Sequence, residues 1–299
     1  MYGVKRDFFE LHASKVTYIR REFPILGENI CREGLPKFLF AVPSVVKPQA
    51  AQDRLEIRQT WASSFYGSNW LQADGIRIAF FFGSENLSSG ELESLRNESG
   101  VYGDIVVGAF NDTYVNLAYK MAVTISWVAD HCSSVDAMVK VDMDTYVNVG
   151  LLLNLTDKLP TQEYPNFVFG TIHNDAHPKV LRTGHWGVPK SVYPFDFYPK
   201  YIYGHSYVVS GPAVKLLAEN FQYFPVIPNE DAFLTGIMAV TLNITRFYHS
   251  SFANLLTVDV VDKIERNILT TALVDSEKRR TIWNFMKPSI GFDDSFEDV

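Results

Sequence analysis

The chain has 299 residues, of which 47% are hydrophobic and 20% are charged. That much apolar material can build the core of one large domain and argues against a globally disordered chain. The formal net charge is −7 and the Lys and Arg residues are scattered, so the sequence lacks the basic patch of a nucleic-acid-binding protein. A mildly acidic protein can still bind a nucleotide through a few local cations or a metal ion.

The cysteines and the apolar patterning bear on where the protein folds. Cys31 and Cys132 are too few for a zinc site or a disulfide framework, so they form either one long-range disulfide or two buried thiols. The sequence contains no run of about 18 apolar residues, so it predicts no transmembrane helix. Its start lacks the apolar core of a signal peptide. Five Asn-x-Ser/Thr triplets nevertheless favour a secretory protein; they begin at Asn86, Asn97, Asn111, Asn154 and Asn243.

The first half of the chain contains three predicted strands and one predicted helix. Residues 1–35 are weakly periodic and are expected to form a leader or stem. Short apolar runs predict strands buried on both faces, at residues 35–46, 75–83 and 102–110. A helix is expected over residues 111–132, with Asn111 or Asp112 as its N-cap, because apolar residues recur there at helical spacing: Leu117, Met121, Ile125 and Val128.

The second half continues the alternation. Residues 135–144 predict a buried strand that ends in carboxylates, and residues 166–177 predict a strand that runs into a loop. A strand and then a helix are expected over 201–221, with Ser210 as the N-cap and Pro212 in the first turn, and a short helix over 230–240. The pattern predicts an α/β fold with a mostly parallel central sheet and flanking helices. We expect one domain over 36–290 and an acidic tail over 291–299.

The strongest local signal for chemistry is the pair Asp142 and Asp144, which leaves the strand predicted at 135–144. Ligands of parallel sheets bind beyond the carboxyl ends of the strands. Two carboxylates at a buried strand end are costly unless a cation neutralises them, and a hard divalent ion such as Mn²⁺ or Mg²⁺ prefers oxygen ligands. The alternative is a strand-end turn with two solvated aspartates.

Two further segments carry candidate residues. Glu230 and Asp231 open the short helix at 230–240, where they either complement the helix dipole or supply a general base for an acceptor hydroxyl. Arg54 and Arg58 lie four residues apart and either hold phosphate or form a solvated helix face.

The histidines give weaker signals. His173 and His177 have the spacing of a metal pair, but the residues around them predict a loop, so no zinc site is expected there. His249 follows a predicted strand and is either a metal ligand or an ordinary polar residue.

Six blocks in order resemble the glycosyltransferase family of β1,3-galactosyltransferases, β1,3-N-acetylglucosaminyltransferases and Fringe proteins. The blocks are RLEIRQTW (54–61), FFFG (80–83), YGDIVVGAFNDTYVNLAYKM (102–121), KVDMDTYVN (140–148), YPKYIYGHSYVVS (198–210) and NEDAFLTG (229–236). The resemblance covers roughly residues 36–288. It implies a nucleotide-diphosphosugar transferase fold of the A type and inverting transfer of a hexose, with galactose favoured, from a UDP-sugar to a hydroxyl of a glycan on protein or lipid in β1,3 linkage.

The resemblance also implies residue roles. Asp142 and Asp144 would hold Mn²⁺, or Mg²⁺, with His249 as a further ligand and Ser251 or Asp275 as alternatives to it. Asp231 would be the catalytic base with Glu230 beside it. Donor binding would fall to Arg54, Arg58, Lys120 and Asp142, and acceptor binding to Trp186, Tyr203 and Tyr207.

This sequence departs from the family pattern at several points. Met143 replaces the middle Asp of the family's acidic motif, and His185 replaces the usual Lys before Trp186. The resemblance implies the Golgi lumen and a membrane anchor that this chain does not encode. A catalytically silent sugar-binding homologue, a β1,3-N-acetylglucosaminyltransferase and a two-carboxylate glycoside hydrolase are the alternative functions.

Overall fold

The computed structural model describes residues 6–32, 36–63, 75–156, 162–249, 252–253, 270–272 and 274–286. A seven-stranded sheet runs through the centre in the order β3-β2-β1-β4-β7-β6-β8. Its strands are β1 (Phe38–Pro43), β2 (Ile76–Gly83), β3 (Ile105–Gly108), β4 (Ala137–Val141), β6 (Phe167–Ile172), β7 (Ile202–Ser210) and β8 (Thr245–Tyr248). All neighbours pair in parallel except β7, which is antiparallel to β4 and β6. The predicted mostly parallel sheet is therefore confirmed.

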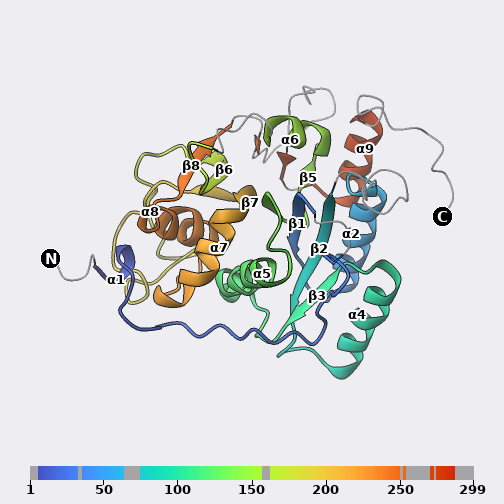
Figure 1. Cartoon of the computed structure of the whole chain (residues 1–299), viewed down its shortest axis with the longest axis horizontal. Coiled ribbons are helices and arrows are strands. Elements are labelled where there is room, and N and C mark those ends of the chain that lie inside the picture. The colour runs from blue at the N-terminus through green and yellow to red at the C-terminus, as the bar shows by residue number, and fades with distance from the viewer. Residues whose placement is uncertain are drawn as a thin grey trace.

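Helices cover both faces of this sheet (Figure 1). One face packs against α2 (Pro48–Gln59), α4 (Ser89–Tyr102), α6 (Val149–Thr156) and α9 (Ser276–Met286). The other packs against α5 (Leu117–His131), α7 (Gly211–Asn220) and the π-helical turn η4 (Ala232–Met238), which continues into α8 (Ala239–Thr241). Strand β1 shows why both faces are covered: Phe38, Phe40 and Val42 belong to the first core, and Leu39 and Ala41 to the second.

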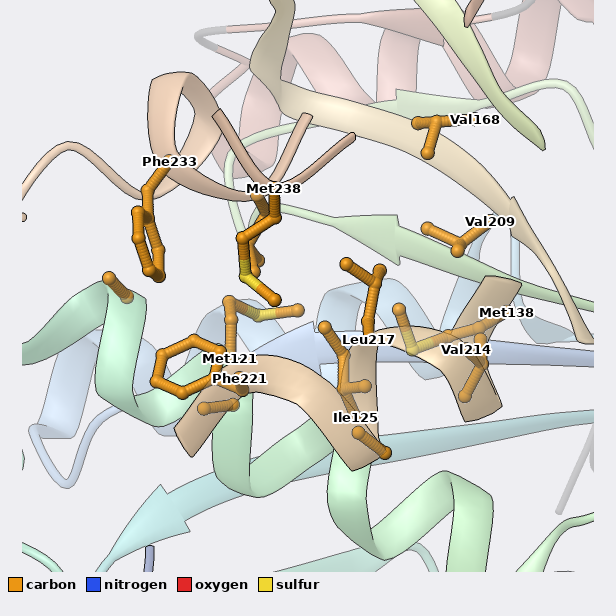
Figure 2. Close-up of a cluster of buried hydrophobic side chains, with 14 of the residues drawn as sticks. Met121, Ile125, Met138, Val168, Val209, Val214, Leu217, Phe221, Phe233 and Met238 are labelled. Carbon is orange, nitrogen blue, oxygen red and sulfur yellow. The ribbon is translucent and has the colours of Figure 1, made fainter. Parts of the chain in front are cut away.

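The core on the α5 side is a continuous apolar layer (Figure 2). Met121 and Ile125 of α5 face Val214 and Leu217 of α7, and Phe233 of η4 closes the layer with its ring centroid 5.3 Å from that of Phe221. These apolar positions recur at helical spacing on α5 and α7, so burying them fixes both helices against the sheet.

Local signals account for the helix ends. The Ser210 hydroxyl accepts from the Ala213 amide at the start of α7, and Pro212 lies in its first turn, as predicted. The N-cap predicted for the helix at 111–132 was wrong. The chain first forms a short 3-10 turn, η2 (Tyr114–Asn116), and Asn116 precedes α5.

The N-terminal segment 6–32 packs along the domain instead of leading away from it. The amide of Val107 on edge strand β3 donates to the Ile25 carbonyl at 2.9 Å, and the Trp127 indole donates to the Leu26 carbonyl at 2.8 Å. Cys31 and Cys132 form a disulfide, which settles the alternative left open by the sequence. The segment covers an edge that would otherwise expose unpaired backbone groups. In the described part of the chain, no helix has the length and apolarity needed to cross a bilayer.

Candidate functional site

The acidic turn follows β4 at the carboxyl edge of the parallel strands. The Asp142 amide donates to the His205 carbonyl at 2.9 Å, and the Thr145 amide donates back to the Asp142 carbonyl at 3.1 Å, which closes the turn. The Asp142 side chain is 37% exposed. Burial raises the pKa of Asp144, and the negative charge of Asp142 raises it further. The two carboxylates are thus close enough to repel each other.

Glu230 and Asp231 come to this turn because β7 runs antiparallel to β4. The start of β7 therefore lies opposite the end of β4, and the Gly204 amide on β7 donates to Asp231 Oδ2 at 3.2 Å. The Ala232 amide donates to Asp231 Oδ1 at 2.8 Å, so both carboxylate oxygens are oriented. A Cβ at Gly204 would lie 3.3 Å from that of Asp231, a tight approach that favours glycine here. Burial raises the pKa of Asp231.

Glu230 has a different environment from its neighbour. It is 3% exposed, and the Tyr207 phenol donates to its Oε1. Burial raises the pKa of Glu230 to about 7, although the positive charge of Lys140 opposes that shift. Tyr207 is itself 1% exposed, so the prediction that it contacts the acceptor is corrected: its ring lies in the core and its hydroxyl orients Glu230.

Lys140 joins these two acidic groups, and the sequence analysis assigned it no role. Its Nζ lies 2.5 Å from Asp142 Oδ1 and 3.9 Å from Glu230 Oε2, and it donates to the Gly204 carbonyl. Burial alone would lower the pKa of Lys140, but the charges of Asp142 and Glu230 outweigh it and raise the pKa. A fully charged ammonium therefore holds the acidic turn beside the loop that carries the predicted base.

The predicted donor-binding cations are all engaged within the fold. Arg54 forms an ion pair with Glu98 at 2.6 Å, and Arg58 contacts Glu98 and Asp104 at 2.7 and 2.8 Å. Buried guanidinium groups need such carboxylates, and these pairs join α2 to α4 and the start of β3. That Arg54 and Arg58 bind the donor stays a prediction.

Lys120 is engaged in the same way. It pairs with Asp112 at 2.7 Å and donates to the Ser44 carbonyl in the loop after β1. Arg54 reaches the same loop through Ser44 Oγ at 3.1 Å. These cations shape the loop that follows β1 at the edge of the sheet where the acidic turn lies, and contact between Lys120 and the donor remains untested.

A second cation missed by the sequence analysis is Arg279, in the C-terminal helix α9. It is 1% exposed and donates from Nη2 to the Met143 carbonyl at 2.6 Å, within the acidic turn. The Val274 amide donates to the Asp144 carbonyl at 2.8 Å. The chain just before and within α9 therefore fixes the backbone of the acidic turn at Met143 and Asp144.

The structure does not bring His249 to the acidic turn. Its ring packs against Phe169 with centroids 5.8 Å apart, and its amide donates to the Gly170 carbonyl. Across the described residues, no three His, Cys, Asp or Glu side chains gather as a metal cluster. The prediction of a third ligand at His249 is therefore unsupported. Asp275 accepts from the Lys278 amide at the start of α9, and Ser251 lies outside the described residues.

Asp142 and Asp144 alone fit a hard divalent cation. Both offer carboxylate oxygens, and their mutual repulsion would be relieved by a positive ion between them. Two protein ligands leave open positions, as is common where substrate phosphates complete the coordination of such an ion.

The two other predicted acceptor-side residues, Trp186 and Tyr203, reach the surface. Trp186 is 59% exposed in the connection between β6 and β7. Tyr203 is half-buried on β7, with its ring centroid 5.0 Å from that of His173. Both are thus available at the surface for a ligand, as expected for acceptor-side residues, although contact with an acceptor remains a prediction. His177 packs instead against Phe197, with ring centroids 6.3 Å apart.

Known proteins are similar to this sequence over most of its length. A UDP-GlcNAc:betaGal β1,3-N-acetylglucosaminyltransferase 9 from Bos taurus is 31% identical over 78% of this chain and 61% of its own length, so the chain spans under two thirds of that relative. A β1,3-galactosyltransferase 5 from Gorilla gorilla gorilla is 31% identical over 73% of this chain and 70% of its own. The solved galactosyltransferase LgtC, bound to donor and acceptor sugar analogs, aligns at a TM-score of 0.40 and 11% identity over 86% of this chain and 97% of that chain. The Galactosyltransferase family matches residues 52–249, and the chain belongs to that family.

Proposed function

We propose that this protein is an inverting, metal-dependent β1,3-hexosyltransferase that moves a hexose, with galactose favoured, from a UDP-sugar to a hydroxyl of a glycan acceptor. The observation that carries the proposal is the convergence of the Asp142–Asp144 pair and Asp231 on Lys140 and Gly204 at one edge of the sheet. The named activities of the two relatives, β1,3 transfer of galactose and of N-acetylglucosamine, support the same linkage.

The acidic pair serves the donor. Asp142 and Asp144 would hold Mn²⁺ or Mg²⁺, which supplies Lewis-acid stabilisation of a diphosphate when bound. Lys140 keeps Asp142 oriented through its 2.5 Å contact, and Arg279 holds the turn through the Met143 carbonyl. The protein thereby presents two carboxylates in a fixed geometry, which lowers the cost of ordering them when the donor binds.

Asp231 serves the acceptor. It takes the proton of the acceptor hydroxyl while the oxygen of that hydroxyl attacks the anomeric carbon. The bond from the anomeric carbon to the phosphate oxygen breaks on the opposite side, and UDP leaves with the electron pair, so the configuration inverts. The amides of Gly204 and Ala232 fix both oxygens of Asp231 before the reaction begins.

The proposed compartment is the Golgi lumen. The Cys31–Cys132 disulfide supports an oxidising compartment. The sequons at Asn111 and Asn243 lie in exposed turns, where glycosylation is sterically permitted. Treatment of protein from native tissue with an N-glycosidase should increase its electrophoretic mobility. An unchanged mobility together with recovery in the cytosolic fraction would contradict the location.

One experiment tests the activity. Purified protein is incubated with UDP-galactose, UDP-N-acetylglucosamine, UDP-N-acetylgalactosamine or UDP-glucose and a methyl β-glycoside, with Mn²⁺, Mg²⁺ or EDTA. We expect a β1,3-linked product with one donor, lost in EDTA and in the Asp144→Ala variant. UDP-sugar binding without product would indicate the silent homologue. Cleavage of a glycoside without any nucleotide would indicate a hydrolase. Full activity in EDTA would refute the proposed metal dependence.

A further inference from the structure

Three aromatic side chains from two distant parts of the sequence gather in the described structure. Tyr114 comes from η2, before α5, and His185 and Trp186 come from the connection between β6 and β7. The rings of Tyr114 and His185 contact each other in a tilted arrangement, with centroids 4.1 Å apart and planes inclined by 32°. The ring of Trp186 meets that of His185 at 5.5 Å, nearly perpendicular. We call these three residues the aromatic platform.

The aromatic platform is open to solvent. Tyr114 is 51% exposed and Trp186 is 59% exposed, and Val115 beside them is 63% exposed. Contiguous exposed apolar surface with a polar border marks ligand or partner sites in soluble proteins. In this case the surface is formed by rigid rings that already contact one another, so little conformational entropy would be lost on binding.

The aromatic platform borders the reacting groups. Burial raises the pKa of the Tyr114 phenol and hydrogen bonding from Trp186 lowers it, while the charges of Asp231 and Asp142 raise it further. Charges act on a group this way only at short range. Tyr114 therefore lies near both the predicted base and the acidic turn, although it follows β3 in the chain.

A second tyrosine–histidine pair lies near the same base. The rings of Tyr203 and His173 contact each other with centroids 5.0 Å apart and planes inclined by 34°. Burial raises the pKa of Tyr203, and the charges of Asp175 and Asp231 raise it further. The tyrosines of two such pairs, Tyr114 from η2 and Tyr203 from β7, are thus both within electrostatic reach of Asp231.

We propose that the aromatic platform of Tyr114, His185 and Trp186 is the subsite that binds the pyranose ring of the acceptor. A β-linked hexopyranoside presents a flat face of C–H groups, which packs on aromatic rings, while its hydroxyls remain free to reach Asp231. Stacking there holds the attacking hydroxyl toward the base. Tyr114 and His185 are then acceptor-binding residues in addition to Trp186. This inference rests on the proposed transferase function.

The test compares Tyr114→Ala, Tyr114→Phe and His185→Ala with the wild type. Methyl β-galactoside, methyl N-acetyl-β-glucosaminide and N-acetyllactosamine serve as acceptors. Tyr114→Ala and His185→Ala should raise the KM for the preferred acceptor by about three- to tenfold, with the donor KM and acceptor-independent donor hydrolysis unchanged. Tyr114→Phe keeps the ring and should stay near wild type. Tyr18→Ala, which removes a 75% exposed tyrosine from the N-terminal segment, is the matched control.

A binding measurement separates this inference from the proposed function. Saturation-transfer NMR should show transfer from aromatic protons to the ring C–H protons of the methyl glycoside in the wild type and Tyr18→Ala, and strongly reduced transfer in Tyr114→Ala. An active wild type with an unchanged acceptor KM in Tyr114→Ala would overturn the platform, as would a rise confined to the donor KM. If no acceptor is glycosylated at all, the proposed function fails, and loss of the NMR transfer in Tyr114→Ala would still support a sugar site. Equal NMR transfer in the wild type and in Tyr114→Ala would refute a sugar site on the aromatic platform.

Discussion

Two adjacent carboxylates show how environment separates roles at the scale of single residues. Asp231 is held by the backbone amides of Gly204 and Ala232, which leaves lone pairs on its oxygens for an acceptor proton. Glu230 is turned into the core, where it accepts from the Tyr207 phenol and faces Lys140. Of the two, Asp231 has the geometry of a base, and Glu230 has that of a residue that joins this segment to Tyr207 of β7.

Asp231→Asn should therefore lower kcat by about 10²–10⁴-fold, because general-base help is typically of that size. Its affinity for UDP, measured by calorimetry with Mn²⁺ present, should stay close to wild type, since Asp142 and Asp144 are untouched. Glu230→Gln should cost less activity. A dead Glu230→Gln variant beside an active Asp231→Asn variant would reverse the assignment, and wild-type activity in both would remove this segment from the reaction.

The buried Glu230 also predicts a pH-dependent stability. Its pKa is about 7 in the folded protein against an ordinary value of 4.5, so the folded state binds more protons than the unfolded state between those pH values. The contribution of Glu230 to the free energy of unfolding then falls as pH rises from about 4.5 to about 7. Glu230→Gln removes this dependence. Its stability relative to wild type, from urea melts, should increase over that pH window and level off above it. A pH-independent difference would contradict the raised pKa.

At the scale of elements, local sequence patterns predict more of the strands and helices than of the contacts that build the site. Runs such as FLFAVP at β1 and AMVKV at β4 are apolar on both faces, and the sequence predicts both as buried strands. Helix α4 was missed, although Ser88 and Glu91 form a capping box that the sequence carries. The partners of Arg54 and Arg58 could not be predicted, because Glu98 and Asp104 meet them only once α4 and β3 have packed on α2.

Helix α9 is the clearest case of an element whose contact with the site cannot be predicted from local sequence patterns. Arg279 reaches the acidic turn from the C-terminal helix, more than 100 residues away in the chain, so no local pattern joins them. The same holds for Tyr114 and His185, whose ring contact depends on two loops that follow different strands. By contrast, Asp142 and Asp144 could be named in advance, because they stand at the end of a strand where a ligand is expected. Asp231 could be named as the base only because its segment, NEDAFLTG, resembles a block of the family.

Arg279→Met should weaken metal binding, because Arg279 orients the turn that carries Asp142 and Asp144. Removing groups that orient metal ligands typically costs 10–100-fold in metal affinity. The Mn²⁺ concentration for half-maximal rate should rise by about that factor, and Arg279→Lys should restore part of it. Arg280→Met is the control on the same helix, since Arg280 is half exposed and pairs with Glu56 at 2.7 Å. Equal metal titrations in all variants would show that α9 supports only the fold.

At the scale of the whole molecule, the N-terminal segment is part of the domain. Beyond its bond to β3, it places Phe8 against Tyr193 with ring centroids 5.1 Å apart and pairs Arg21 with Asp130 at 2.8 Å. These contacts join the segment to α5 and to the connection between β6 and β7 (Figure 1). A leader or stem expected from weak periodicity is thus replaced, over residues 6–32, by a covering layer whose positions are set by tertiary contacts.

The Cys31–Cys132 disulfide closes this layer and should contribute substantially to stability. The two cysteines are 101 residues apart in sequence, and a disulfide across so long a loop strongly restricts the unfolded chain. Such a disulfide typically adds about 2–4 kcal/mol to the free energy of unfolding. The double variant Cys31→Ala, Cys132→Ala should lower the free energy of unfolding by about that amount in urea melts. Its kcat at 25 °C should remain close to wild type, because Cys132 follows the C-terminal end of α5 whereas Lys120, which contacts the loop after β1, lies in the first turn of that helix. Dithiothreitol supplies the internal control: it should lower the Tm of the wild type toward that of the double variant and leave the double variant unchanged. A wild-type Tm that does not respond to full reduction would mean that the packing of Phe8, Ile25 and Trp127 holds the segment without the covalent bond.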